Sequence, residues 1–195
     1  DLSVRWWNQR NGDYGAGFIF TMYLADHLGG GPAVRQLVQD SATGGLGVEN
    51  LALSPVSGQS GKIGRTMGEI FANFSIAATI DSDQGIYGFS NLDLNPSCGG
   101  STFCRITPAD TNSDWSTPWS STGHTMEGWG IRSFKFTPGA ASPAPLTLRV
   151  TSDVSNFDGV LVYKSTADGL WATQDLDFNS NVATGLIQGL SLIHI

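Results

Sequence analysis

The sequence predicts an α+β protein in which a small helical bundle precedes an incomplete antiparallel β-sandwich. Apolar residues recur with helical spacing through residues 13–80. From residue 124 onward, apolar and polar residues alternate in short runs that Pro and Gly separate, which is typical of strands. We therefore expect a helical domain over residues 1–95, a linker over 96–123 and the sandwich over 124–189.

The composition narrows the classes of function. The 195 residues suffice for one or two domains with their own cores. A net charge of −7 argues against nucleic acid and anionic membrane surfaces as partners. The sequence contains no run of about 18 apolar residues, so it predicts no membrane span. Charged residues make up only 14%, and Gly, Ser, Thr and Asn are abundant, which favours a secreted protein.

The helix expected over residues 66–80 organises the helical domain. Thr66 and Glu69 have the spacing of a capping box at its start. The apolar residues that follow form a wide, partly aromatic stripe. These residues are Met67, Ile70, Phe71, Phe74, Ala77 and Ala78. Such a stripe must pack against something large, so we predict that Ile70, Phe71 and Phe74 lie in the core.

Three further segments before this helix are predicted to be helical. The first spans residues 14–28, with Asp13 as its N-cap, and the glycines that follow end it. The second starts at Pro32 and runs to about Ala42. The third is a short segment over 47–54. Four helices with short connections are typical of a small bundle.

The predicted strands follow the same logic of alternation. They are Phe134 with Phe136, Leu146 to Val150, Val160 to Tyr163, and a run that begins at Leu176 with Phe178. Short strands at this spacing favour an antiparallel sandwich, which we expect to be incomplete because the chain stops early.

Cys98 and Cys104 enclose a short loop with two glycines. Such a loop can close into a disulfide without much strain, and a disulfide implies an oxidising compartment. The alternative is a pair of metal ligands, but no other Cys and no nearby His completes a site. We expect the disulfide.

The two ends of the chain suggest a fragment. Asp1 begins the sequence without an initiator Met, and no signal peptide is present. Residues 190–195 resemble the in-frame translation of a transposon adapter used in DNA library preparation. We therefore expect them to be a non-native tail on a natural protein cut by the end of an assembled read, and we leave them out of the fold prediction.

The histidines do not form a catalytic motif. They stand at positions 27, 124 and 194, and no His-Glu-x-x-His occurs. His124 and Glu127 are three residues apart, and we interpret them as a surface pair. His27 lies near the end of the first helix, where a partly protonated imidazole suits the helix dipole. The alternative for His27 is a hydrogen-bond donor to a transition state in a cleft. No residue is assigned a catalytic role.

Other candidate sites are weaker. No Gly-x-Ser-x-Gly elbow occurs, and residues 44–47 lack the Lys of a phosphate loop. Asp81-Ser82-Asp83-Gln84-Gly85 has the spacing of half a calcium loop, but we favour a solvated loop after the helix as its interpretation. Three tryptophans are candidates for stacking on sugars, but packing is their commoner role. They are Trp115, Trp119 and Trp129.

The order of several segments resembles one family. These segments are Tyr14–Gly29, a Val/Leu helix, Gly45–Leu53, Thr66–Phe74, Ile86–Phe89 and Met126–Phe134. They resemble the region that follows the zinc-binding motif in secreted bacterial zinc metallopeptidases of the hyicolysin-like and immune-inhibitor-A-like kinds. The resemblance covers residues 10–95 and, more loosely, 125–165.

The resemblance implies a fold and a function. The helical domain would be the C-terminal subdomain of a zincin-type catalytic domain, one wall of its cleft, and the sandwich an accessory domain. In the intact parent, zinc would activate water to hydrolyse protein or peptide substrates. The zinc-binding motif is absent here and expected upstream of Asp1, so the fragment should be inactive alone. Two alternatives remain: a non-catalytic extracellular adhesion or carbohydrate-binding module, and a peptidase homologue that lost its zinc site.

Overall fold

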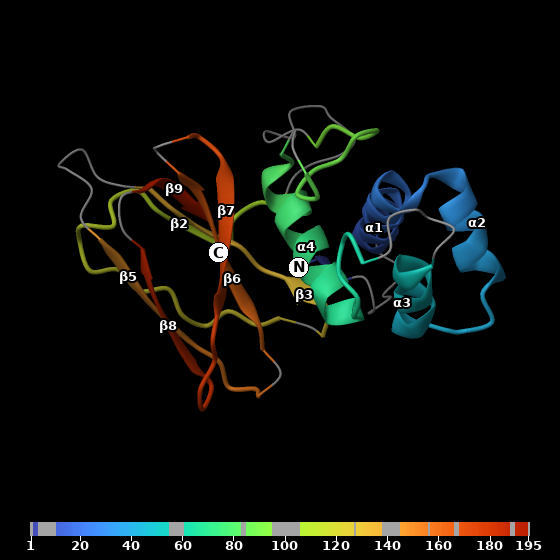
Figure 1. Cartoon of the computed structure of the whole chain (residues 1–195). Helices are drawn as coiled ribbons and strands as arrows, with labels where there is room; N and C mark the ends of the chain where they lie inside the picture. The colour runs from blue at the N-terminus through green and yellow to red at the C-terminus, as the bar shows by residue number, and fades with distance from the viewer. Residues whose placement is uncertain are drawn as a thin grey trace. The chain divides into compact units, whose positions relative to one another are not determined.

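The protein has a mixed α/β fold with four helices and small, mostly antiparallel sheets in the part of the chain that the structure describes (Figure 1). This computed structural model describes residues 2–3, 11–54, 61–82, 85–94, 106–126, 128–137, 145–155, 157–165, 168–187 and 190–194. The chain divides into two compact units. The helical unit comprises residues 1–107 and 126–131, and the β unit comprises 108–125 and 132–195.

The four predicted helices are present. They are α1 (Asn11–Leu28), α2 (Gly31–Gln39), α3 (Gly45–Leu53) and α4 (Met67–Ile80). Helix α2 ends earlier than expected because Asp40 turns the chain. The backbone of Asp40 is extended, and the Asp40 carboxylate accepts a hydrogen bond from the Ala42 amide at 2.8 Å. Gly30 and Gly44, which precede α2 and α3, both have positive φ, a conformation that favours glycine.

The capping box of α4 is confirmed. The Thr66 hydroxyl accepts from the Glu69 amide at 3.3 Å, and the Glu69 carboxylate accepts from the Thr66 amide at 3.2 Å. A second carboxylate supports the same helix end, because Glu49 of α3 accepts from the Met67 amide at 2.7 Å. The start of α4 is thus bonded both by its own residues and by α3.

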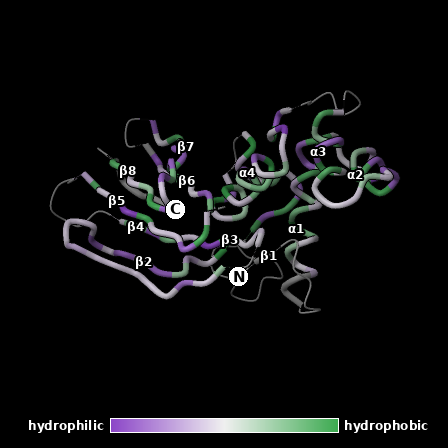
Figure 2. Tube along the Cα trace, turned by 90° about the horizontal axis from the view of Figure 1, so that it is seen from below, coloured by the Kyte–Doolittle hydropathy of each residue, from purple (hydrophilic) through white to green (hydrophobic). Residues whose placement is uncertain are grey.

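Helices α1 and α4 supply the centre of the helical core, and apolar residues recur along both (Figure 2). Ile70 and Phe74 are fully buried, as predicted. The Phe74 ring lies 5.0 Å from that of Phe20 and 5.7 Å from that of Tyr23. Phe71 differs from the prediction, because it is only partly buried at the rim of this core.

The segment at Met126–Ile131 belongs to the helical unit rather than to the predicted sandwich. Strand β3 (Gly130–Ile131) pairs antiparallel with β1 (Leu2–Ser3). Trp129 packs edge-on against Phe71, with the ring centroids 5.3 Å apart. Its φ is +59°, which is strained for a bulky side chain, so the surrounding contacts hold it in place.

The β unit contains one five-stranded sheet and one two-stranded sheet in its described residues. The larger sheet has the order β2 (Asp110–Asn112), β4 (Phe134–Phe136), β9 (Leu190–His194), β6 (Gly159–Ser165) and β7 (Trp171–Leu176). Its β2–β4 pair is parallel and its other pairs are antiparallel. The smaller sheet pairs β5 (Leu146–Thr151) with β8 (Val182–Ile187).

The two sheets of the β unit share one apolar core. Its buried members are Trp115, Phe136, Leu146, Leu148, Leu161, Leu176 and Ala183. Strand β8 approaches β6 closely at Gly185, where a Cβ would lie 2.8 Å from Cδ1 of Leu161. Side chains from both sheets therefore interdigitate in this unit.

Several predicted boundaries differ from the structure. The predicted linker over 96–123 contains β2, and the units divide between Thr107 and Pro108. Leu176 ends a strand instead of beginning one, and the strands β1, β2, β3, β7 and β8 were not predicted. Leu190–His194, which the fold prediction left out, form β9 between β4 and β6. Their origin in an adapter stays a prediction. Cys98 and Cys104 lie outside the described residues.

Candidate functional site

Polar side chains form one connected group in each unit. In the helical unit they surround the loop of residues 85–94, which we call the clamped loop. In the β unit they lie in the segment after β2. Among the described residues, no three His, Cys, Asp or Glu side chains lie close enough to hold a metal ion. None of the helices in the described ranges is long and apolar enough to cross a membrane.

His27, in the last turn of α1, lies beneath the clamped loop. It is only 4% exposed, and its Nε2 lies 3.0 Å from the Gly88 carbonyl oxygen. Because a carbonyl only accepts, Nε2 carries the proton. Burial lowers the pKa of His27, and Lys62 lowers it further, against the opposing effects of Gly88 and Asp26. The imidazole is therefore neutral at neutral pH, which corrects the interpretation as a partly protonated dipole cap.

Asp26, the neighbour of His27, holds the next part of the loop. Its Oδ2 accepts from the Ser90 amide at 2.8 Å and from the Asn91 amide at 3.2 Å. The Asn91 side chain donates to the other carboxylate oxygen. One carboxylate thus accepts hydrogen bonds from three N–H groups of the loop. These groups belong to residues 64 and 65 positions further along the chain.

Asp81 holds the loop from α4. It occupies the helix C-cap with φ of +44°, and its amide donates to Ala77. Its carboxylate accepts from the Phe89 amide at 3.2 Å and from the Leu94 amide at 2.7 Å. These amides compensate a negative charge that the helix dipole disfavours. Both oxygens of Asp81 are engaged in this way, Asp83 lies outside the described residues, and calcium at this position stays a prediction.

Gly88 is required by the close approach of the loop to the end of α4. A Cβ on this residue would overlap the Ser82 carbonyl oxygen, so only glycine fits here. The Ser82 amide in turn donates to the Tyr87 carbonyl at 2.8 Å. The loop therefore passes directly over the residue that follows the Asp81 cap.

Tyr23 connects this group to the helical core. Its ring lies edge-on to His27 at 4.7 Å and to Phe89 at 5.9 Å. Burial, aided by Tyr87, raises the pKa of Tyr23 well above its usual range. The phenol of Tyr23 thus stays neutral throughout the accessible pH range.

A hollow of about 340 Å³ borders the clamped loop. It is lined by Asp81, Phe89, Ser90, Asn91, Leu92 and Asp93.

In the β unit, a series of hydrogen bonds connects the side chains of Asp110, Ser121, His124 and Arg132. Ser121 Oγ bonds to Asp110 Oδ2 at 2.8 Å and to Nε2 of His124. Nδ1 of His124 lies 3.2 Å from Nη1 of Arg132, whose Nη2 donates to the Thr125 carbonyl at 2.6 Å. The imidazole also lies edge-on to Phe134 in β4.

The direction of these hydrogen bonds argues against Ser121 as a nucleophile activated by His124. Arg132 can only donate, so Nδ1 of His124 accepts and Nε2 carries the proton. Ser121 then accepts from His124 and donates to Asp110. A serine hydrolase needs the opposite order, with the histidine taking the serine proton. The hydrogen bonds from the Ser121 hydroxyl and from the Thr111 amide lower the pKa of Asp110.

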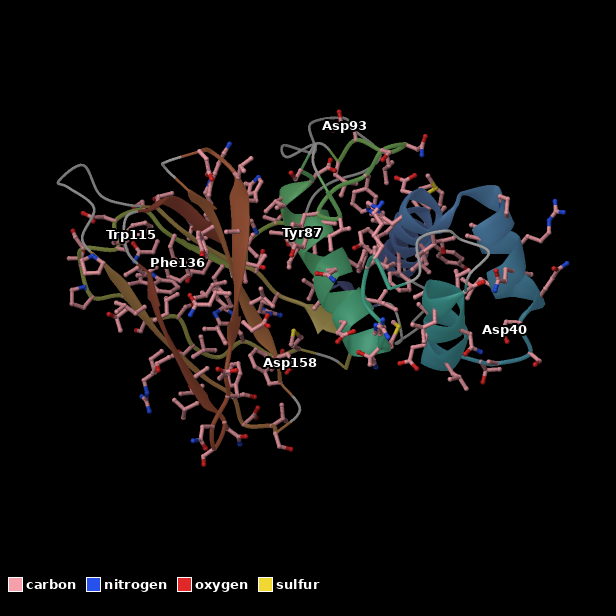
Figure 3. All side chains as sticks on the ribbon, viewed as in Figure 1. Asp40, Tyr87, Asp93, Trp115, Phe136 and Asp158 are labelled. Atoms are coloured by element: carbon pink, nitrogen blue, oxygen red, sulfur yellow. The ribbon has the colours of Figure 1, made fainter. Side chains whose placement is uncertain are left out.

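The structure places the other candidates in packing or surface roles. Trp115 is buried in the β core together with Phe136, and Figure 3 labels both side chains. Trp119 is 39% exposed and lies edge-on to Phe136. Glu127 lies outside the described residues, so its pairing with His124 stays a prediction.

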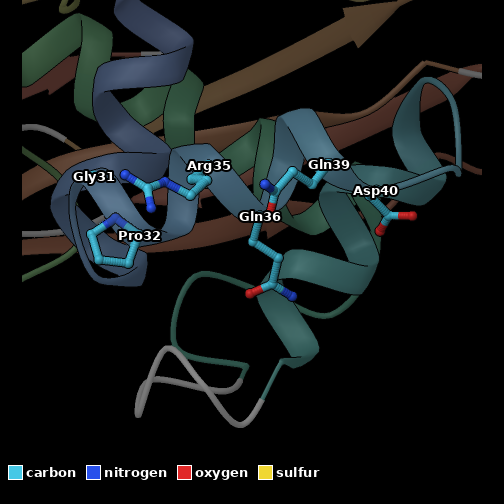
Figure 4. A pocket seen from close by; sticks show the side chains of 6 residues that line it. All are labelled: Gly31, Pro32, Arg35, Gln36, Gln39 and Asp40. Atoms are coloured by element: carbon cyan, nitrogen blue, oxygen red, sulfur yellow. The ribbon is translucent and has the colours of Figure 1, made fainter.

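A second hollow, of about 580 Å³, lies along α2. Its lining residues are Gly31, Pro32, Arg35, Gln36, Gln39 and Asp40. Figure 4 shows the Arg35 side chain beside Pro32 and the Asp40 carboxylate at the other end of the helix. The polar groups do not converge on one point, so we assign no site here.

Sequence reasoning named His27, Asp81 and His124 but none of their partners. Asp26, Ser121 and Arg132 belong to no recognisable motif, and only the folded chain brings them to these positions.

No protein-family model, curated protein or solved structure matches this chain.

Proposed function

We propose that this chain is part of a secreted bacterial zinc endopeptidase acting on protein or peptide substrates. In this proposal, the helical unit is the C-terminal subdomain of a zincin-type catalytic domain. The β unit is an accessory β-sandwich. The alternative is a non-catalytic extracellular adhesion or carbohydrate-binding module.

One observation carries the proposal. The segments on which the family resemblance rests are those that pack together in the helical unit. Tyr14–Gly29 supplies His27, which bonds to Gly88 in Ile86–Phe89. The same helix supplies Phe20, which packs on Phe74 of Thr66–Phe74. The segments that carry the resemblance therefore pack into one unit, which supports their assignment to one subdomain.

The shared core of the two sheets supports the second part of the proposal. Gly185 of β8 lies against Leu161 of β6, so the β5–β8 sheet packs on the larger sheet through apolar side chains. A sandwich requires two sheets that pack face to face, so this contact supports the proposal.

The described residues do not fit a zinc site. Nε2 of His27 is engaged with Gly88, and both ring nitrogens of His124 are engaged with Ser121 and Arg132. The proposal therefore places the zinc ligands and the general base in a part of the parent protein outside this sequence.

The test compares this chain with a protein extended upstream to include a His-Glu-x-x-His motif. Zinc binding is measured by competition with a chromophoric chelator, and hydrolysis by release of casein peptides. We expect stoichiometric zinc and hydrolysis in the longer protein and neither in this chain alone.

Three results would contradict the proposal in different ways. Zinc-dependent hydrolysis by this chain alone, abolished in His27→Ala, would place the active site within it. An inactive longer protein with an intact motif would indicate a homologue without activity. A parent gene without the motif would favour the non-catalytic module.

A further inference from the structure

The segment after β2 places an exposed tryptophan and an exposed histidine on one row of β4. Phe134 and Phe136 are two residues apart in this strand, so their side chains lie on the same face of the sheet. Trp119 lies edge-on to Phe136 with the ring centroids 5.3 Å apart, and His124 lies edge-on to Phe134 at 4.9 Å. Positions two apart in a strand are separated by about 7 Å. Trp119 and His124 therefore lie close together at the surface of the β unit.

The polar side chains beside these rings hold one another in place. Asp110 of β2 pairs with Phe134 of β4, so its carboxylate lies on the same face of the sheet as that ring. Ser121 Oγ donates to Asp110 Oδ2 and accepts from His124. The other carboxylate oxygen of Asp110 accepts from the Thr111 amide at 2.8 Å. Each oxygen can accept a second hydrogen bond, so the carboxylate is fixed and still able to bind a ligand.

Trp119 is the apolar part of this surface. Its side chain is 39% exposed, whereas Trp115 of the same segment is buried in the β core. Among the described residues, Trp119 makes the edge contact with Phe136, and its indole N–H makes no hydrogen bond. An aromatic ring beside a few fixed polar groups is the usual composition of a small-molecule binding site.

We propose that this surface binds a carbohydrate: a pyranose ring stacks on the Trp119 indole, and hydroxyl groups of the same sugar donate hydrogen bonds to the Asp110 carboxylate. The inference goes beyond the proposed function, because it assigns a ligand to the β unit and does not depend on a zinc site elsewhere.

The chemistry of the surface favours a sugar over other ligands that stack on tryptophan. A pyranose with equatorial hydroxyl groups has flat faces of C–H groups and a rim of hydroxyl donors, which match an indole beside a carboxylate. Hydrogen bonds to a charged acceptor are stronger than those between neutral groups. Nucleic acid bases also stack on tryptophan, but Asp110 and the net charge of −7 repel their phosphates. Because β-linked polymers of glucose and N-acetylglucosamine have the equatorial arrangement, we expect a glycan of this class.

The experiment is saturation-transfer NMR on the whole chain, with cellopentaose and chitopentaose as the probes. The aromatic protons of the protein are saturated, and the transfer to each sugar proton is measured. In these sugars, successive axial hydrogens lie on opposite faces of the ring. Stacking on Trp119 predicts stronger transfer to the hydrogens of one face than to those of the other. It also predicts a shift of the Trp119 indole N–H resonance, which is identified by its absence in Trp119→Phe.

Three variants relate binding to the named side chains, with the affinity measured by calorimetric titration. Trp119→Ala removes the stacking ring and should weaken binding about tenfold or more. Asp110→Asn removes the charged acceptor at nearly constant size and should weaken binding about tenfold. Trp171→Ala is the matched control, because β7 lies at the opposite edge of the five-stranded sheet from β2, and its affinity should be unchanged. Thermal unfolding checks that each variant is folded, and the saturation transfer tests the stacking contact in the unmodified chain.

The inference is overturned if neither probe binds, if the transfer is equal on the two faces of the sugar, or if Trp171→Ala weakens binding as much as Trp119→Ala does. Binding of oligothymidylate with equal affinity would indicate unspecific stacking and would overturn the assignment to sugars. Zinc binding and casein hydrolysis by the longer protein test the peptidase proposal separately, so the failure of either proposal is visible without the other.

Discussion

The two polar groups described above each contain a histidine. The two histidines differ in how deeply they are buried and in how far along the sequence their hydrogen-bond partners lie. His27 is 4% exposed and bonds to a carbonyl 61 residues away. His124 is exposed and bonds to side chains three and eight residues away. The first joins two separate segments in a dry environment, whereas the second organises one solvated segment. Burial makes the first group matter for stability and acid response.

The cores of the two units differ in a parallel way. The helical core is built on fully buried aromatic and branched side chains of α1 and α4, including Tyr23 and Phe74. The β core is smaller, with Leu161 as its most buried large side chain. We therefore expect the largest effects of substitution in the helical unit, and the following predictions test that difference.

The largest effect is expected for Phe74→Ala. Phe74 is fully buried among Phe20, Tyr23 and Phe71, so its truncation should lower the free energy of unfolding of the helical unit by about 3–5 kcal/mol. Urea denaturation measures this loss. Phe71→Ala is the matched control and should cost less, because Phe71 is only partly buried. Equal losses in the two variants would show that the rim is packed as tightly as the centre.

The next effect is expected for Gly88→Ala. The added Cβ would overlap the Ser82 carbonyl, so the loop must move and give up its bond to His27. We expect a loss of about 2–3 kcal/mol in the same measurement. Gly17→Ala is the control, because Gly17 lies in α1 with open space around its Cα. That variant should gain about 0.5–1 kcal/mol. A tolerated Gly88→Ala would mean that the loop is not held as described.

Acid should affect the two units at different pH values. The pKa of His27 is lowered by burial, so between its folded and unfolded values the unfolded chain binds more protons and stability falls with falling pH. This loss begins below about pH 6.5 in the helical unit. The pKa values of Asp110 and Asp114 are lowered by hydrogen bonds, those from Ser121 and Ser116 first.

The contribution of these carboxylates is present above about pH 4 and is lost as pH falls through their folded pKa values. Hydrogen exchange with mass spectrometry at several pH values follows each unit separately. Simultaneous loss of protection in both units near pH 6 would contradict the assignment to His27.

The smallest effect is expected at the turn before β8. Ser180 and Asn181 both have positive φ, as in a type I′ turn, and neither is a glycine. The double variant Ser180→Asn, Asn181→Gly should stabilise the β unit by about 0.5–1 kcal/mol, measured by thermal unfolding. Asn179→Gly is the control: Asn179 pairs with Val182, so this change should not stabilise. A gain of the same size in the control would remove the explanation from turn geometry.

Local patterns predicted the four helices and the three strands β4, β5 and β6. The capping box at Thr66 and Glu69, the positive-φ glycines between helices and the alternation at Leu146–Val150 all act within a few residues of one another. The helix ends and strand cores were therefore accessible from the sequence. The missed strand β8 contains Gly185, which interrupts the apolar alternation but is needed for close packing against Leu161.

The candidate sites were predicted only in part. His27, Asp81 and His124 were recognised as notable, but the role of each was set by a partner that no spacing rule indicates. His27 was expected to be partly protonated at a helix end, and burial beneath Gly88 reverses that expectation.

By itself, the sequence determined which segments form the four helices and the strands β4, β5 and β6, because those signals are local hydrogen bonds and periodic burial. Only the tertiary structure decided that Asp26, His27 and Asp81 hold one loop, that Met126–Ile131 joins the helical unit, and that β2 lies parallel to β4. These contacts join residues far apart in the chain. Their free energies depend on the path of the backbone between them and on how much water the packed core excludes.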